Sequence, residues 1–124
     1  MIKSRNIHPE AGRWSEAQKL ASSTTASMLF TNPTGKEILV DAVVVNVTTA
    51  AASKNVYAGV ITSGTTGTNA NNELMDAVAL TSGQTVISTE PTTVPVGGSV
   101  ILTLSATDAT LVAYGYVRFK ELPF

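Results

Sequence analysis

Apolar and polar residues alternate along most of the chain, which is the period of β-strands rather than helices. The strongest such segment is 38–47, which is rich in valine, a residue that favours strands. Both of its faces are apolar, although Asp41 interrupts one of them, so we expect a strand covered on both sides. The two expected faces consist of Ile38, Val40, Ala42 and Val44, and of Leu39, Val43, Val45 and Val47.

The segment 111–119 predicts a second long strand with two different faces. A sandwich of two sheets buries only one face of each sheet, so the face that carries two tyrosines needs a further cover. A second copy of the chain is the favoured cover, because monomers rarely expose large apolar patches. The alternative is that an end of the same chain folds over this face. The residues expected at an oligomer interface are Tyr57, Tyr114, Tyr116 and Phe119.

Shorter strands separated by turn residues complete the pattern. They are expected at 26–30, 55–62, 77–80, 84–89 and 99–106. In the first of them Ala26, Met28 and Phe30 would share a face, and Gly59 in the second marks a bulge or a close backbone approach. A short helical turn is expected at 71–78. About seven or eight strands bounded by turns predict an all-β fold, a β-sandwich of jelly-roll type.

Residues 1–20 lack this alternation and predict an extended N-terminal arm before a sandwich domain at 21–124. One helical turn is expected at 15–21. The arm holds the single His and the single Trp, and its four basic and two acidic residues give it a net charge of +2. We interpret it as an arm that docks on an acidic surface, with chance scatter of a few charges as the alternative.

Composition argues against catalysis, cofactors and metals. The chain has no Cys, which removes thiolate chemistry, and its one histidine, His8, lies in the arm rather than beside a nucleophile. The polar loop around Asn69, Asn71 and Glu73 resembles a calcium loop only faintly, because Leu74 and Leu80 occupy positions that an EF-hand needs as glycine and glutamate. We expect no enzyme activity, no catalytic residues, no cofactor and no metal.

The same composition argues against nucleic-acid and membrane partners. Charged residues make up 14% of the chain and the net charge is −1, so no basic face with interleaved aromatic residues is expected. No apolar run reaches the ~20 residues that span a bilayer. The N-terminus lacks the apolar stretch of a signal peptide.

The passages 35–62 and 97–119, both rich in Thr, Ala and Val, resemble small virion proteins of tailed bacteriophages, and among these the head decoration (cement) proteins. The resemblance implies a β-rich homotrimer that is made in the host cytoplasm, binds the major capsid protein of a phage and stabilises the capsid exterior of the virion. We expect the arm to bind the capsid through Lys3, Arg5, Arg13 and Trp14. The alternative function is a fibre or tail-associated recognition module, which would bind a host glycan or other receptor through exposed tyrosines and the 63–73 loop.

The purified chain should self-associate, either in solution or on its partner, because its apolar content is high and its charge is low. Sedimentation equilibrium at high micromolar concentration measures this directly. A mass of three chains would support the trimer. A monomer in solution that also stays single on its partner would contradict it.

Overall fold

The computed structural model describes residues 13–51, 55–64, 67 and 71–121. These residues form an all-β protein in which every strand pairing is antiparallel, and none of them is helical. The strands are β2 (Arg13–Trp14), β3 (Gln18–Lys19), β4 (Ser27–Thr31), β5 (Ile38–Thr49), β6 (Asn55–Ile61), β7 (Met75–Ala79), β8 (Thr85–Ser88), β9 (Thr92–Val94), β10 (Ser99–Leu104) and β11 (Val112–Glu121).

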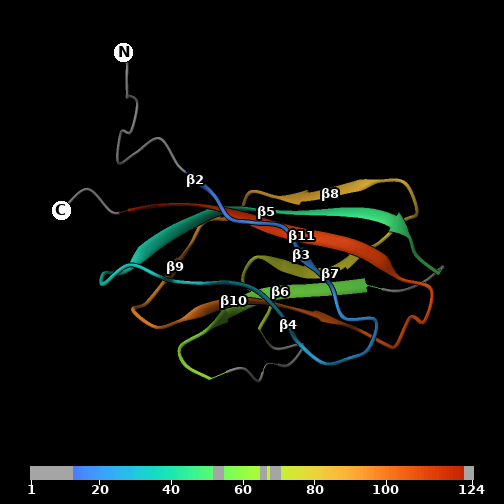
Figure 1. Cartoon of the computed structure of the whole chain (residues 1–124), viewed down its shortest axis with the longest axis horizontal. Helices are drawn as coiled ribbons and strands as arrows, with labels where there is room; N and C mark the ends of the chain where they lie inside the picture. Colours follow the sequence, from blue (N-terminus) through green and yellow to red (C-terminus); the bar gives the residue numbers. More distant parts are fainter. Residues whose placement is uncertain (1–12, 52–54, 65–66, 68–70, 122–124) are drawn as a thin grey trace, which may run out of the picture.

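The strands form two sheets that pack face to face (Figure 1). One sheet has the order β4-β10-β6-β7. The other has the order β2-β11-β5-β8, with β3 also paired to β11 and β9 also paired to β5. The short strands β2 and β3 thus act as one interrupted edge strand, and β8 and β9 act as another.

When β2 and β3 are counted as one strand, and β8 and β9 as another, the strand pairings are nested. The first strand pairs with the last (β2 and β3 with β11), the second with the next to last (β4 with β10), and so on inward to β6 with β7. This is a long hairpin rolled into two facing sheets, which is the arrangement of a jelly roll. The predicted all-β jelly-roll sandwich is therefore confirmed.

The core lies between the sheets and is built from aliphatic residues of β5, β6, β10 and β11. Phe30 of β4 and Phe119 of β11 stack across it with ring centroids 4.5 Å apart. Gly115 lies where β11 passes β4, and a Cβ at this position would make a tight contact with Leu29, at 3.0 Å from its Cδ2. The expectation that 111–119 is a strand with two different faces is confirmed, since Leu111, Ala113, Val117 and Phe119 are buried in the core while Tyr114 is exposed.

A β-bulge in β5 corrects the expected division of its residues between two faces, although the centre of the strand is apolar and buried on both sides, as expected. Arg118 lies opposite Ala42 and Phe119 lies opposite Val40, so Asp41 has no opposite residue on β11. A bulge inverts the alternation of side chains beyond it. As a result, the residues of both expected faces join one core, namely Ile38, Val40, Val43, Val45 and Val47.

A bulge in β4 has the same effect. Met28 lies opposite Ile101 and Phe30 opposite Val100, which leaves Leu29 without an opposite residue on β10. Leu29 is buried in the core and Phe30 packs against it. The prediction that Ala26, Met28 and Phe30 share one face is therefore wrong, because strict alternation does not hold across the extra residue.

The helical turn expected at 71–78 is wrong as well, because this segment enters strand β7. Before β7 begins, Glu73 Oε1 accepts the backbone N–H of Val60 at 3.0 Å, and Asn71 Nδ2 donates to the carbonyl of Val60 at 3.3 Å. Both side chains thus satisfy backbone groups of β6. The predicted close approach at Gly59 is confirmed, since a Cβ there would lie 2.3 Å from Glu73 Oε1.

The described part of the expected arm differs from the prediction. Residues 13–19 are extended, but they pair with β11 instead of standing free, and the helical turn expected at 15–21 does not form. Leu20 donates its N–H to Ala113 at 2.9 Å and is buried in the core. The physical reason is that this segment forms backbone hydrogen bonds with the otherwise open edge of β11. Neither the alternation nor the composition of the segment predicts this pairing. Residues 1–12, with Lys3, Arg5 and His8, lie outside the described residues.

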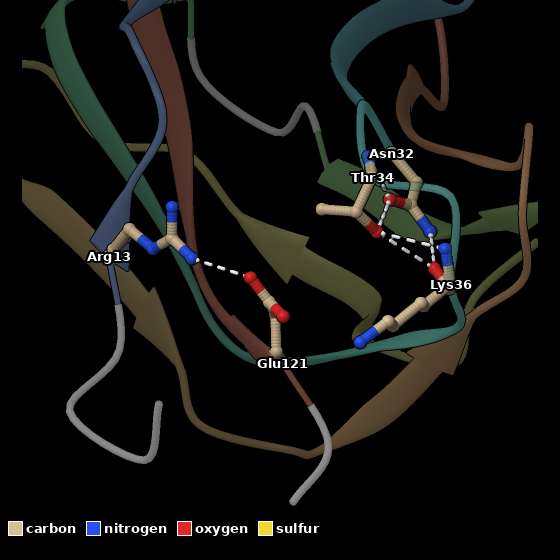
Figure 2. A network of polar contacts seen from close by, with 5 residues as sticks. All are labelled: Arg13, Asn32, Thr34, Lys36 and Glu121. Carbon is tan, nitrogen blue, oxygen red and sulfur yellow. Dashed lines mark hydrogen bonds and ion pairs between the residues drawn. The ribbon is translucent and has the colours of Figure 1, made fainter. Parts of the chain in front are cut away.

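Buried polar side chains fasten the loops at the ends of the roll. Asn32 is nearly inaccessible; its amide donates to the carbonyls of Lys36, Val94 and Pro95 at 2.7–3.2 Å. Its Oδ1 accepts the N–H and hydroxyl of Thr34 (Figure 2). Asp108 acts similarly at another loop and accepts the N–H groups of Ala51 and Thr110. These bonds hold in place the connections that carry the chain from one sheet to the other.

Replacing Ala77 by Gly should stabilise the protein. Ala77 in β7 has a φ of 54°, a left-handed conformation that costs a non-glycine residue about 1 kcal/mol. We expect Ala77→Gly to raise the free energy of unfolding by up to ~1 kcal/mol in a urea titration.

The matched control is Ala79→Gly, which changes an exposed alanine of the same strand and should lower the free energy of unfolding by about 0.5–1 kcal/mol. Equal destabilisation by both substitutions would show that Ala77 is not strained.

Candidate interaction surface

The outer face of the sheet β2-β11-β5-β8 carries a row of apolar side chains whose two ends are exposed. Tyr116 lies opposite Val44, and Val44 lies opposite Ile87 on its other side. Residues directly opposite in antiparallel strands point to the same face, so these three side chains are neighbours. Trp14 contacts Tyr116 and extends the row onto β2. We call Trp14, Tyr116, Val44 and Ile87 the apolar row.

This face holds most of the exposed apolar surface in the described structure. Its large apolar residues Trp14, Ile87 and Tyr114 are 53%, 60% and 41% exposed, and the fourth such residue, Val96, lies in a turn elsewhere. Val44 is only 5% exposed, because its neighbours on the row shield it. A contiguous patch of this kind on one face is typical of an interaction site.

The bulge at Asp41 also orders the side chains around Trp14. Asp41 Oδ1 accepts a hydrogen bond from Arg118 Nε at 2.8 Å, which fixes the guanidinium. This guanidinium lies over the Trp14 ring at 5.4 Å from its centroid, a cation–π contact. On its other side Trp14 meets Tyr116 edge to face, with centroids 5.4 Å apart. Two neighbours therefore hold Trp14 while half of its surface stays open to solvent.

Charge is distributed unevenly between this face and the rest of the molecule. The region around the row has a net charge of +1, from four basic and three acidic residues. It comprises β2, β3, the link between them, β11 and Asp41. Elsewhere the described residues carry one basic and five acidic residues, a net charge of −4. Arg13 of this region is paired with Glu121 at 2.8 Å (Figure 2). The apolar row thus has a slightly basic surround on an acidic molecule.

The outer face of the other sheet is different, because described residues of the β6–β7 connection lie against it. Ile101 points away from the core cluster, since its neighbours Val100 and Leu102 point into it, and yet it is fully buried. Gly67 lies against it so closely that a Cβ would be 1.7 Å from Ile101 Cδ1. The two outer faces of the sandwich are therefore not equivalent, and the apolar row lies on the more open one.

The residues expected at an oligomer interface do not form one surface. Tyr114 and Tyr116 lie on the face of the apolar row. Phe119 points to the opposite side, where it is 8% exposed and stacks on Phe30. Tyr57 belongs to β6 in the other sheet, where it lies opposite Thr103.

The residues expected to bind a capsid and those expected to bind another copy meet on this face. Trp14 was expected in the capsid-binding arm and Tyr116 at the oligomer interface, but their rings are in contact. Sequence reasoning missed that Ile87 and Val44 belong to this row. The alternation of 84–89 places Ile87 on one face with Thr85 and Thr89, but only the register with Val44 shows that it extends the row.

No sign of a chemical centre is found in the part of the chain that the structure describes. It contains no cluster of three potential metal-ligating side chains and no detected pocket. None of its segments is a helix of the length and hydropathy needed to cross a bilayer. The side chains of the faint calcium motif that can be placed, Asn71 and Glu73, bind the backbone of Val60.

Comparison with solved structures identifies the class of jelly roll. The chain matches a subunit in the acid-stable capsid of Helicobacter pylori bacteriophage KHP30 with a TM-score of 0.63 and 18% identity, over 91% of this chain and 89% of that one. It matches a chain of the capsid asymmetric unit of cyanophage Pam1 with a TM-score of 0.55 and 16% identity, over 96% and 92% of the two chains. It therefore shares its fold with capsid chains of similar length.

A more distant match is to infectious bursal disease virus, Gx strain, with a TM-score of 0.52 and 11% identity, over 97% of this chain and 37% of that one. No protein-family model matches the chain, and neither does any curated protein sequence. At these identities the matches show the fold alone, which is a jelly roll of the kind found in viral capsids.

Truncation of Trp14 and of Phe119 should have very different effects on stability. Trp14 is half exposed and rests on one ring and one guanidinium, so Trp14→Ala should lower the free energy of unfolding by only about 1 kcal/mol. Phe119→Ala opens a cavity in the core and should cost about 3–5 kcal/mol. Guanidinium titrations of both variants measure the difference. Similar losses would mean that Trp14 is a core residue and that its exposure in the structure is wrong.

Proposed function

We propose that this chain is a non-enzymatic structural protein of a bacteriophage virion, which binds the capsid exterior as a decoration or cement protein. The observation that carries the proposal is the exposed apolar row on one face of a jelly roll of the capsid type. The resemblance of the two sequence passages to head decoration proteins supports the same assignment.

The apolar row is the proposed contact with the major capsid protein. Trp and Tyr are the residues that most often dominate binding energy at interfaces, and here they are already ordered by Arg118 and Asp41. Side chains that are fixed before binding lose little conformational entropy when the partner arrives. The slightly basic surround of the row favours a partner surface with acidic groups around an apolar patch.

The contact works mechanically in this proposal. Each copy would remove apolar surface from water at the joints of the shell, at roughly 25 cal/mol per Å² before the costs of association. Decoration also repeats over many equivalent sites. Assembly as a homotrimer, which the resemblance implies, would let three weak contacts act together, since linked sites bind far more tightly than single ones.

Binding to undecorated heads tests the proposal. Heads of the phage that encodes this chain, assembled without it, are mixed with the purified protein and pelleted. The wild-type protein should pellet with the heads. Trp14→Ala should bind about 30-fold more weakly, which corresponds to the ~2 kcal/mol of an interface hot spot.

The matched control is Val96→Ala, which truncates an equally exposed apolar residue away from the row and should bind as the wild type does. Unchanged binding of Trp14→Ala would reject the row as the contact. If the wild-type protein itself stays in the supernatant, the decoration function is wrong.

A further inference from the structure

The edge of the six-stranded sheet at β8 is open. β8 pairs with β5 on one side, from Ser88 opposite Val43 to Thr85 opposite Asn46. No described residue pairs with the other side of β8. The backbone hydrogen bonds outside the ladders likewise leave Thr85 and Ile87 without a described partner. Figure 1 shows β8 at the border of its sheet. An open edge presents unpaired N–H and C=O groups and is a template for another strand.

The direction of these groups follows from the register. Val47 N donates to Gln84 O at 2.9 Å, so this pair is a hydrogen-bonded one. In an antiparallel ladder hydrogen-bonded pairs recur at every second residue, which makes Val45↔Val86 and Val43↔Ser88 the bonded pairs. The N–H and C=O groups of the alternate residues, Thr85 and Ile87, therefore point to the open edge.

Within β8 itself this edge carries none of the side-chain or backbone features by which proteins block unwanted strand pairing. Charges, prolines and bulges normally serve this purpose, as does a short edge strand. The stretch 77–89, which contains β8, has no charged residue and no proline, and the first of each, Glu90 and Pro91, follow directly after it. The remaining edges do have such features. β2 and β3 carry Arg13 and Lys19, β7 carries Asp76, and β4 contains the bulge at Leu29.

We propose that β8 pairs antiparallel with β8 of a second copy of this chain across a two-fold axis, with Ile87 opposite Ile87 of the second copy. Pairing two copies of the same uncharged edge buries no charge, which a strand bearing charges would do. Side chains that point to the same face of the sheet would also lie opposite each other. Val86 of one copy would lie opposite Ser88 of the other, and both point inward from the sheet. The two apolar rows then join end to end at the paired Ile87 side chains.

This two-fold contact is separate from the proposed three-fold assembly and from capsid binding. It uses backbone groups of the edge rather than the outer face of the sheet, so it would join one trimer to the next. It does not rest on the proposed function, because it can form between purified chains. A strand of four residues forms a weak contact, so a covalent trap is the appropriate detector.

A single introduced cysteine provides that trap, because the chain has no Cys. Antiparallel partners have Cα atoms about 5.5 Å apart, within the range that a disulfide spans. Under mild oxidation, Ile87→Cys should form a disulfide-linked dimer on non-reducing gels at least tenfold faster than Val96→Cys. Val96 is the matched control, since the two side chains are 60% and 58% exposed.

Adding Thr85→Lys to the Ile87→Cys variant should suppress the dimer, because it places a charge beside each new strand pair, while circular dichroism confirms that the fold is kept. Equal rates for the two single-cysteine variants would overturn the proposal. Cross-linking of Ile87→Cys only within assembled particles, and only to a different protein, would also overturn it and would identify a strand of that protein as the occupant.

Discussion

The pairing of β5 with β11, including the bulge at Asp41, is the constraint on which the rest of the structure depends. These are the two longest strands, and each supports an interrupted edge strand on its other side. Asp41 and Thr48 of β5 both lack an opposite residue on β11, and the bulge at Asp41 turns Val43, Val45 and Val47 toward the same core as Ile38 and Val40. The carboxylate of Asp41 then binds Arg118 on the outer face, where Arg118 orders Trp14. One irregularity therefore closes the core and builds the surface.

Alternation predicted the fold well because most strands here have one buried face. The inward residues of β11, from Leu111 to Phe119, follow the pattern without exception, and so do the turns rich in Pro and Gly that separate the strands. The bulges were not predicted, since Leu29 leaves no mark on the local pattern and the interruption at Asp41 reads equally well as one polar residue on a regular face. The strands β2 and β3 were missed for another reason. They are too short and too exposed to show a period, and β11 holds them in place.

The candidate surface was predicted in its residues but not in its geometry. Trp14 was singled out as the single Trp of the expected arm and Tyr116 as a tyrosine on the uncovered face of 111–119, so they were assigned to different partners. Only the register shows that they touch and that Val44 and Ile87 continue the same row. Phe119 was expected at an interface and lies in the core, because its apolar character alone does not distinguish the two kinds of position. Side-chain direction, which the bulge controls, makes that distinction.

A cryo-electron microscopy reconstruction of the native phage particle tests the central claim, that the outer face of the β2-β11-β5-β8 sheet is the contact face, most directly. We expect density for this jelly roll outside the shell, with Trp14, Tyr116 and Ile87 packed against the major capsid protein and the loop-covered face of the other sheet turned to solvent. A jelly roll that binds through the β6–β7 loop, with the apolar row open to water, would contradict the claim.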